Sequence, residues 1–323
     1  MTTGTLGIKA DFLTSKHKQE IEHIAAHNGL KLHYFTDEAD LDASIGQCEI
    51  LYGYIPPEKL RQAESLRWLA CASSGVEQYL ADYLYAAPGV ILTNSAGAYG
   101  ITISEHILMT ALMLLRRMPE YTAVSAAHRW ENLGRIRSIY GSVITVVGTG
   151  DIGTAFAQRA KALGAAHVRG VHRTNRLLPR CYDESYAVED LDFALAGADL
   201  VVLCVPETRE TENLITRERL GLLKKTSVLI NVGGGSVLDQ EALMDLLNSG
   251  KIAGAALDVT TPEPLPADHP LWHTKNLIIT PHVSGNMSLD ITCDLDVSIF
   301  CDNLTRYCRK QPMKHVVERS VGY

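Results

Sequence analysis

The feature that most constrains the fold of this chain is a repeated alternation of short apolar runs with helical stretches. In the first hundred residues, five runs have the length and composition of buried strands: LGIKA, LKLHYF, EILYGYI, LRWLACAS and VILTNS. Helical patterns lie at about 15–28 and in PPEKLRQAES, which begins with proline. Because strands joined through helices run parallel, the pattern predicts a parallel α/β sheet.

A second alternating region begins at Ser142 and contains six strand candidates: VITVVG, HVRGVHR, DLVVLCVP, SVLINVG, IAGAALDV and NLIIT. Helices between successive strands cover both faces of a sheet, so this region predicts a Rossmann-type doubly wound domain. Between the two regions we expect a long apolar helix at 101–118 that stops before Pro119, and then an irregular segment to about Tyr140. A closing helix is expected at about 289–309.

The composition indicates a soluble globular protein of two domains. The chain has 323 residues, of which 46% are hydrophobic and 21% charged. A net charge of −7 disfavours a nucleic-acid partner, and the longest apolar run, 107–115, is too short to cross a membrane. The start of the chain shows no secretory signal. The seven cysteines form no CxxC pair and no metal-binding spacing, so we expect reduced thiols, a cytoplasmic location and no metal site.

The strongest binding motif is GTGDIG, which follows the strand VITVV and opens a helix near Ile152. Gly148 is expected to make the tight turn, Gly150 to let the backbone approach a pyrophosphate, and Gly153 to let the helix pack on the strand. The helix start at Asp151 and Ile152 supplies N–H groups and a positive dipole for the phosphates. The motif therefore predicts a dinucleotide site.

The choice of cofactor is expected at the end of the next strand, in the sequence HVRGVHRTNR. An acidic residue there would hold the ribose 2′-hydroxyl of NAD(H), but no Asp or Glu occurs between Thr154 and Tyr182. His172, Arg173 and Thr174 offer instead a cationic and hydroxyl-bearing end that suits a 2′-phosphate. The alternative is a solvated basic loop. We expect NADP(H) to be favoured over NAD(H).

Three later residues can carry acid–base chemistry. Asp258 follows a strand, Glu263 lies in a proline-rich loop, and His282 follows the strand NLIIT. A histidine paired with a carboxylate suits proton transfer to and from a carbonyl/alcohol pair. A lone histidine at a strand end is more often structural, so the pairing is what this interpretation requires.

These motifs, taken in series, resemble the D-isomer-specific 2-hydroxyacid dehydrogenase family. GTGDIG, VPETRET, LINVGGGSVLDQEAL, ALDVTTPEPLPADHPLW, TPHVSG and the C-terminal FCDNLTRY occur in the family's order and spacing over essentially the whole chain. The resemblance implies hydride transfer between a nicotinamide cofactor and a small-molecule 2-keto acid or 2-hydroxy acid. It also implies that His282 and Glu263 are the acid/base pair.

The resemblance further implies an architecture. A flavodoxin-like substrate domain would comprise residues 1–98 and 289–323, and a dinucleotide-binding domain would comprise residues 99–288. The helix and loop at about 101–140 resemble dimerisation elements, so a homodimer is implied.

By position, the resemblance assigns most of the site. Asp258 would hold the nicotinamide carboxamide, and His282 and Gly285 would border the cofactor. The nicotinamide ribose side would be lined by Val205, Pro206, Thr211, Val232 and Gly233. The substrate carboxylate would meet the backbone of Ser74, Gly75 and Val76, with Tyr99 bordering the same cleft.

One position departs from the family pattern. The family reads I-N-x-x-R-G, and its arginine pairs with the substrate carboxylate, whereas this chain has Gly234 there and no arginine between Arg219 and Arg306. Losing one partner of a buried charged pair costs about 2–5 kcal/mol, or roughly 30- to 4,000-fold in kcat/KM toward a 2-keto acid. The glycine run is also expected to loosen its loop.

Four interpretations follow from this departure. The chain is a substituted variant with weakened turnover, or an enzyme whose carbonyl substrate lacks a carboxylate. Alternatively, a cation from the interdomain segment (Arg129, Arg135 or Arg137) reaches the anion. Lastly, the chain is a nucleotide-binding regulatory protein on a dehydrogenase scaffold. The retained Asp258, Glu263 and His282 favour the enzyme interpretations.

Overall fold

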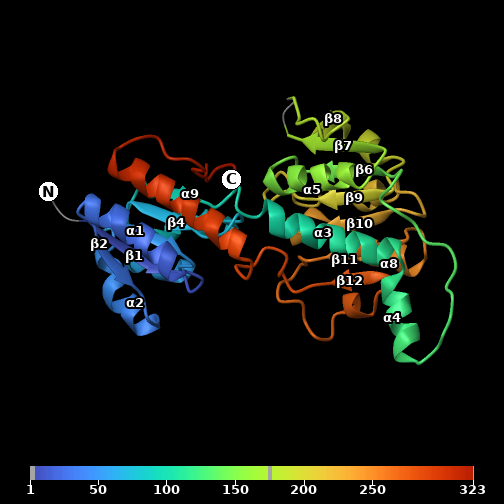
Figure 1. The fold of residues 1–323 in the computed structure, drawn as a ribbon, viewed down its shortest axis with the longest axis horizontal. Helices are drawn as coiled ribbons and strands as arrows, with labels where there is room; N and C mark the ends of the chain where they lie inside the picture. The colour runs from blue at the N-terminus through green and yellow to red at the C-terminus, as the bar shows by residue number, and fades with distance from the viewer. Residues whose placement is uncertain (1–3, 174–176, 323) are drawn as a thin grey trace. The chain divides into compact units, whose positions relative to one another are not determined.

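The computed structural model describes residues 4–173 and 177–322, which form two compact units. Of the described residues, 4–99 and 286–322 form the first unit, and 100–173 and 177–285 form the second. Each unit is built on one parallel sheet (Figure 1).

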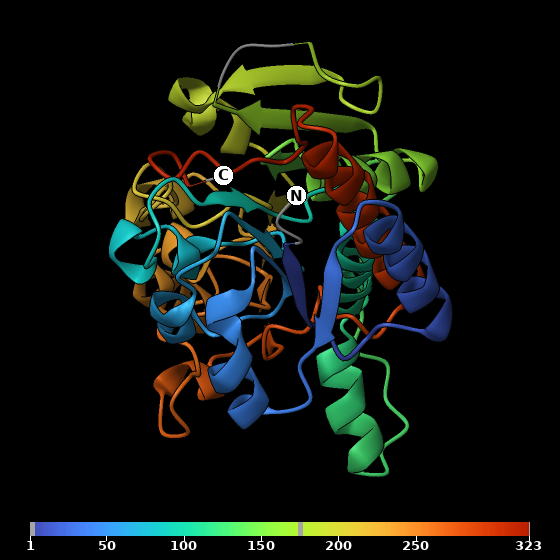
Figure 2. The same ribbon diagram turned by 90° about the vertical axis from the view of Figure 1, so that its left-hand side faces the viewer.

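The first unit contains a five-stranded sheet in the order β2-β1-β3-β4-β5. Its strands are β1 (Thr5–Lys9), β2 (Lys31–Tyr34), β3 (Ile50–Gly53), β4 (Trp68–Cys71) and β5 (Ile91–Thr93). Helices α1 (Ser15–His27) and α9 (Asp290–Cys308) lie side by side (Figure 2). They pack against Ile50, Tyr52 and Trp68, while α2 (Glu38–Ser44) packs on the opposite face around Leu51 and Leu69.

The second unit contains a seven-stranded sheet in the order β12-β11-β10-β9-β6-β7-β8. Its strands are β6 (Val143–Val147), β7 (His167–His172), β8 (Glu184–Ala187), β9 (Leu200–Leu203), β10 (Val228–Asn231), β11 (Gly254–Leu257) and β12 (Leu277–Ile279). The chain order reverses between β6 and β9, which is the switch point where doubly wound sheets bind dinucleotides.

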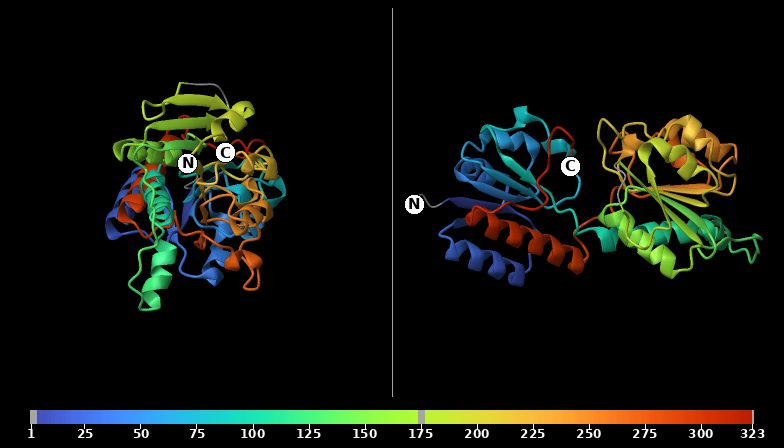
Figure 3. Two further views of the ribbon diagram at one scale, coloured as in Figure 1. Left: turned by 90° about the vertical axis from the view of Figure 1, so that its right-hand side faces the viewer. Right: turned by 90° about the horizontal axis from the view of Figure 1, so that it is seen from above.

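Helices cover both faces of the second sheet. Helices α3 (Gly100–Leu115) and α5 (Asp151–Ala162) pack together on one face (Figure 3). The other face is covered by α6 (Leu191–Leu195), α7 (Arg217–Leu220) and α8 (Gln240–Asn248) through an apolar core that includes Val201, Leu229 and Leu243. The α/β class with a Rossmann-type sheet is therefore confirmed.

Three local details differ from the sequence predictions. PPEKLRQAES is helical, but only over Pro57–Gln62 and as a 3₁₀ helix. The apolar helix ends at Leu115, and a further helix, α4 (Met118–Ala126), carries Pro119 in its first turn, where the missing N–H costs nothing. Strand β8 was not expected, because ESYA is only partly buried and carries no apolar run.

Candidate active site

The candidate site residues of the second unit lie at the carboxyl edge of its sheet. The loops after β6, β7, β9, β10, β11 and β12 all leave the sheet on this edge, because the strands are parallel. Residues that are far apart in the sequence are therefore brought to one edge.

The GTGDIG turn has the geometry of a phosphate-binding loop. Gly148 has φ +98°, and a Cβ there would lie 2.7 Å from the Cys204 carbonyl oxygen. A Cβ on Gly153 would lie 2.0 Å from the Gly148 carbonyl oxygen, so the third glycine lets α5 sit on the turn. A Cβ on Gly150 would meet no heavy atom within 4 Å. This open space lies at the first turn of α5, where Asp151 and Ile152 begin the helix, so the turn fits a dinucleotide phosphate.

The end of β7 offers one described guanidinium. His172 is buried, and its Nε2 lies 2.7 Å from Ser185 Oγ on the neighbouring strand, which favours a structural role for its ring. Arg173 is exposed and lies 3.7 Å from the Glu210 carboxylate. An exposed pair of this kind is weak, so a 2′-phosphate can compete with Glu210 for Arg173. Thr174 lies outside the described residues.

The loops after β9 and β10 contact each other through their backbones. Thr211 Oγ1 donates a hydrogen bond of 2.6 Å to the Pro206 carbonyl and shapes the first loop. A Cβ on Gly233 would lie 2.2 Å from the Val205 carbonyl oxygen, so Gly233, next to Val232, is required for this approach.

His282 and Glu263 form a pair. The distance from His282 Nδ1 to Glu263 Oε2 is 2.9 Å, and the two side chains are 64% and 37% exposed. Glu263 Oε1 accepts a hydrogen bond of 2.8 Å from the Thr260 N–H, which fixes the carboxylate. Because Nδ1 faces Glu263, Nε2 is the ring atom left to exchange a proton with a ligand.

Asp258 anchors the loop that carries His282. Its Oδ1 accepts from Thr280 Oγ1 at 2.6 Å and from Val283 N at 3.0 Å, and its Oδ2 accepts from Ser284 N at 3.0 Å. Burial raises the pKa of this carboxyl group, but hydrogen bonds from Ser284, Thr280 and Val283 outweigh it and lower the pKa below 3.8. With its side chain only 1% exposed, Asp258 is better suited to hold this loop, which ends at Gly285, than to contact a carboxamide.

The glycine run after β10 is closely packed, and the expectation of a loosened loop was wrong. Asn231 donates from Nδ2 to the Gly234 carbonyl at 2.8 Å and accepts from Gly233 N at 3.1 Å. A Cβ on Gly235 would lie 2.2 Å from the Thr260 carbonyl oxygen. A Cβ on Gly234 would lie 2.8 Å from Glu207 Cβ and 3.0 Å from Glu207 N. The glycines thus permit three close backbone approaches.

Two contributing residues were missed in the sequence. Glu207 packs on Gly234 and accepts a hydrogen bond of 3.2 Å from Ser236 N. The side-chain amide of Gln240 donates from Nε2 to the Thr261 carbonyl at 3.0 Å and accepts from Thr261 N at 3.2 Å, and so supports the loop of Glu263. Glu207 lies in VPETRET and Gln240 in LINVGGGSVLDQEAL. Their contacts join separate loops, so the residues next to each of them in the sequence do not predict these contacts.

In the first unit, the loop after β4 carries Ser74, Gly75 and Val76. Gly75 is exposed, the Ser74 carbonyl accepts from Asn94 Nδ2 at 2.9 Å, and Val76 is buried in the core. Tyr99 is also buried, and its hydroxyl donates to the Ala72 carbonyl next to this loop. Its ring is therefore better placed to hold the loop than to line a cleft.

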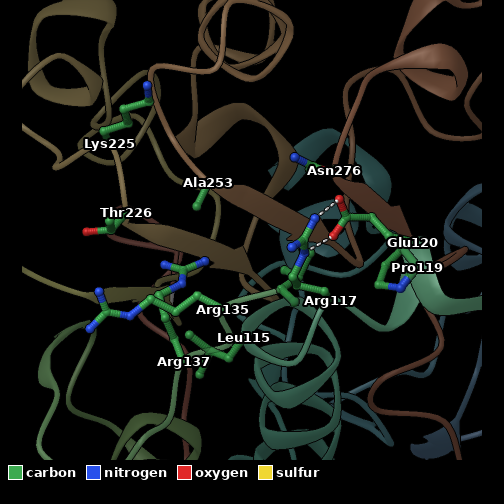
Figure 4. A pocket seen from close by; sticks show the side chains of 11 residues that line it. Leu115, Arg117, Pro119, Glu120, Arg135, Arg137, Lys225, Thr226, Ala253 and Asn276 are labelled. Atoms are coloured by element: carbon green, nitrogen blue, oxygen red, sulfur yellow. Dashed lines mark hydrogen bonds and ion pairs between the residues drawn. The ribbon is translucent and has the colours of Figure 1, made fainter. Parts of the chain in front are cut away.

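A cavity of about 340 Å³ in the second unit lies at the amino edge of the sheet, away from the loops described above. It is lined by Arg135, Arg137, Lys225, Thr226 and Ala253, among others, and the last three precede β10 and β11 (Figure 4). Arg129 is paired with Glu131 at 3.2 Å. The proposal that Arg135 or Arg137 reaches a substrate anion beside His282 is therefore wrong, because these side chains lie at the opposite edge.

Metal-binding clusters and membrane-spanning helices are both absent from the described residues. Over 4–173 and 177–322, no group of three or more His, Cys, Asp or Glu side chains could hold a metal ion. Within the same ranges, no helix is long and apolar enough to span a membrane.

Comparison with known proteins identifies relatives over most of the chain. The model of the family "D-isomer specific 2-hydroxyacid dehydrogenase, NAD binding domain" matches residues 108–284. Glyoxylate/hydroxypyruvate reductase B of Pectobacterium carotovorum is 32% identical over 240 residues, which cover 72% of this chain and 73% of that protein. For two other curated relatives, the matched stretch spans 63% and 61% of their length, less than two thirds.

Solved structures of the same family are similar to this chain over nearly its whole length. A D-isomer specific 2-hydroxyacid dehydrogenase family protein from Aeromonas salmonicida is 31% identical, with a TM-score of 0.86 over 98% of this chain and 100% of that chain. A D-isomer specific 2-hydroxyacid dehydrogenase from Xanthobacter autotrophicus, solved with NADPH and MES, is 27% identical, with a TM-score of 0.82 over 100% of both chains.

Proposed function

The chain belongs to the D-isomer specific 2-hydroxyacid dehydrogenase family, and from this premise we propose that it transfers hydride between NAD(P)H and a small carbonyl compound. The observation that carries the proposal is the 2.9 Å pairing of His282 with Glu263 at the same sheet edge as the open GTGDIG turn. The second unit is then the dinucleotide-binding domain, and the first unit is the substrate domain.

In the direction of reduction, His282 donates a proton from Nε2 to the carbonyl oxygen. Glu263 accepts a hydrogen bond from Nδ1–H and stabilises the positive charge of the imidazolium before Nε2 gives up its proton. Thr260 keeps the Glu263 carboxylate oriented, and Asp258 keeps the backbone of His282 in place. When bound, the nicotinamide supplies the hydride to the carbonyl carbon.

The family substrate, a 2-keto acid that gives a D-2-hydroxy acid, is expected to be turned over weakly. Gly234 carries no guanidinium for the carboxylate, and Arg135 and Arg137 lie at the other edge of the sheet. A carbonyl compound without a carboxylate is therefore the second candidate substrate, because its binding needs no guanidinium at position 234. A purely regulatory nucleotide-binding role remains the alternative that the first experiment must exclude.

That experiment follows NADPH and NADH oxidation with glyoxylate, pyruvate, hydroxypyruvate, phenylpyruvate and simple ketones. We expect turnover that falls about 10²- to 10⁴-fold in His282→Asn, and roughly ten- to a hundredfold in Glu263→Gln. His315→Asn is the matched control, because His282 and His315 share a left-handed backbone (φ 51° and 54°). If no compound is turned over in a manner that depends on His282, the chain is a binding protein and the proposal fails.

For the cofactor, we propose a preference for NADP(H). The Arg173 guanidinium at the end of β7 supports it, and the nearby Glu210 carboxylate opposes it only weakly because both side chains are exposed. Arg173→Ala should raise KM for NADPH much more than KM for NADH, and Glu210→Gln should lower KM for NADPH. Equal effects of Arg173→Ala on both cofactors would refute the contact.

We also propose a homodimer in the cytoplasm. Met109, Leu112, Met113, Met118, Tyr121 and Ile136 line an apolar surface on α3, α4 and the following segment, and Met109 is 47% exposed. A second copy of the chain would bury it. Light scattering should show a dimer that Leu112→Glu converts to monomer, and a monomeric wild type would refute it. All seven cysteines are free, which supports a reducing compartment.

A further inference from the structure

The cavity at the amino edge of the second sheet is lined by cations that outnumber its acids. Arg117, Arg135, Arg137 and Lys225 line it, and Glu120 is the one acid among the described residues of its lining (Figure 4). The two carboxylate oxygens of Glu120 accept hydrogen bonds from Nε and Nη2 of Arg117, so these two charges cancel. Three cations are then left in the lining, in a chain whose net charge is −7.

The half-buried guanidinium of Arg137 makes no hydrogen bond to any residue within 4–173 and 177–322, and its Nη1 is shut off from solvent. Burial lowers the pKa of Arg137 below its usual value, although attraction by the Asp199 carboxylate opposes this shift. Asp199 itself accepts hydrogen bonds from Lys224 Nζ and Val143 N. Because a guanidinium stays charged in proteins, its partly desolvated charge is unfavourable without a closely paired anion. An anion in the cavity would relieve this cost.

The other side chains of the cavity suit a doubly charged oxyanion. Arg135 and Lys225 are exposed, and neither forms an ion pair with a residue that the structure describes. Guanidinium groups bind phosphate oxygens through two parallel hydrogen bonds, and an ammonium adds a point charge. The hydroxyl of Thr226 offers a further hydrogen bond. The volume of about 340 Å³ is at the small end of the range of ligand pockets, which suits free phosphate or a small phosphate ester.

We propose that this cavity is a second anion site, which binds a phosphate group through Arg135, Arg137 and Lys225. It is separate from the dinucleotide site, because it lies at the opposite edge of the sheet from the GTGDIG turn. Its lining shares no residue with the apolar surface on α3 and α4, so a second copy of the chain on that surface does not need to fill it. A bound phosphate would join the segment at 135–137 to the turn before β10 and so stabilise the second unit.

A titration with inorganic phosphate tests the proposal, at an ionic strength that is kept constant with chloride. Saturating NADPH is present, so that phosphate does not enter the GTGDIG turn. We expect saturable binding by calorimetry with a Kd of about 1 mM or below, and a rise in Tm of roughly 3–6 °C at a phosphate concentration of ten times Kd. Glycerol phosphate is titrated in parallel. A lower Kd for glycerol phosphate than for phosphate identifies an ester as the ligand, and a higher one identifies the free ion.

Two variants locate the bound phosphate, whether or not NADPH binds. Arg137→Met keeps the aliphatic stem and removes the guanidinium, so it should raise the Kd for phosphate by about tenfold or more. Without phosphate, its Tm should equal or exceed that of the wild type, because the charge that it removes has no closely paired anion. Arg129→Met is the matched control, because Arg129 lies in the same segment but is exposed and paired with Glu131, and it should leave the Kd unchanged.

The proposal fails if phosphate shows no saturable binding, or if Arg137→Met binds it as tightly as the wild type does. It also fails if Arg129→Met weakens binding as much as Arg137→Met, since the effect would then reflect net charge alone. A lower Tm of Arg137→Met without phosphate would show that the protein itself compensates this guanidinium, and it would overturn the proposal as well. None of these measurements depends on turnover, so they are independent of the proposed function.

Discussion

The loop that carries His282 depends on a single buried carboxylate, so Asp258→Asn should impair both stability and activity. The carboxylate accepts three hydrogen bonds, from Thr280, Val283 and Ser284, and is almost inaccessible to solvent. Asparagine offers one acceptor oxygen, and its NH₂ group must then face at least one of these donors. The variant therefore loses a charge-assisted bond and places two donors against each other.

The magnitude follows from these contacts. A hydrogen bond to a charged group contributes about 1.5–3 kcal/mol, and leaving a buried donor unpaired costs about 1–3 kcal/mol. We expect Asp258→Asn to lower the free energy of unfolding by about 3 kcal/mol, which lowers Tm by roughly 6–12 °C in a unit of this size. Because His282 N donates to the Asp258 carbonyl and His282 lies between the side-chain donors, kcat should fall with it.

The pKa of Asp258 determines how the stability difference between wild type and Asp258→Asn changes with pH. The pKa of Asp258 in the folded protein lies below 3.8, so its contribution is present above the pKa of the unfolded chain and is lost as pH falls through the folded value. Wild type and Asp258→Asn should therefore differ in Tm at pH 7 and converge toward pH 3. Calorimetry at several pH values and kcat at pH 7 measure both effects.

Asp199→Asn is the control for this experiment. Asp199 accepts from Val143 N at 2.9 Å at the amino edge of the same sheet, so its loss should lower Tm and leave kcat unchanged. A Tm difference for Asp258→Asn that is as large at pH 3 as at pH 7, or an unchanged kcat, would refute the reasoning.

Three further predictions test other parts of the two units. Gly150→Ala meets open space, so it should keep the wild-type Tm but weaken NADPH binding, measured by fluorescence. Gly153→Ala would place a Cβ 2.0 Å from a carbonyl oxygen and should lower Tm itself. Equal effects of the two variants on Tm and on NADPH binding would contradict the roles assigned to these glycines. Burial raises the pKa of Asp296 to about 6, so the first unit should lose about 3 kcal/mol of stability as pH rises from 4 to 6, and urea unfolding of Asp296→Asn should lack that slope. Gly234→Arg alone should raise kcat/KM for 2-keto acids less than Gly234→Arg combined with Glu207→Gly, since Glu207 Cβ stands 2.8 Å from the new Cβ; equal gains would show that the loop yields freely.

Much of the fold could be predicted because buried parallel strands have a simple signature. Strands β6, β9 and β10 are covered on both faces and read as continuous apolar runs. Strand β8 lies at the end of the sheet order and is only partly buried, so it lacks this signature. Helix α4 was not predicted because Pro119 was interpreted as a helix stop, although proline is also common in the first turn of a helix.

Site residues, too, could be predicted where a role depends on local backbone conformation, and could not be predicted where it depends on contacts between loops. The turn residues Gly148 and Gly153 could be assigned from sequence because their roles depend on backbone conformation within one strand–turn–helix unit. Contacts between loops of different strands, such as Gln240 with Thr261, depend on how far each loop rises from the sheet, and local sequence carries no record of that.

The packing around Gly234 changes what the missing arginine means. An isolated loss of a cation would leave a space that a single substitution could refill, and weak turnover of keto acids would be its only consequence. Here Gly233, Gly234 and Gly235 lie against Val205, Glu207 and Thr260, so the glycines bring three loops together. Removing the guanidinium and admitting Glu207 are one structural change, because a side chain at 234 and the present position of Glu207 exclude each other. A side chain at 234 therefore requires the Glu207 loop to move, so restoring the arginine alone would not restore the loop packing that the family's arginine needs.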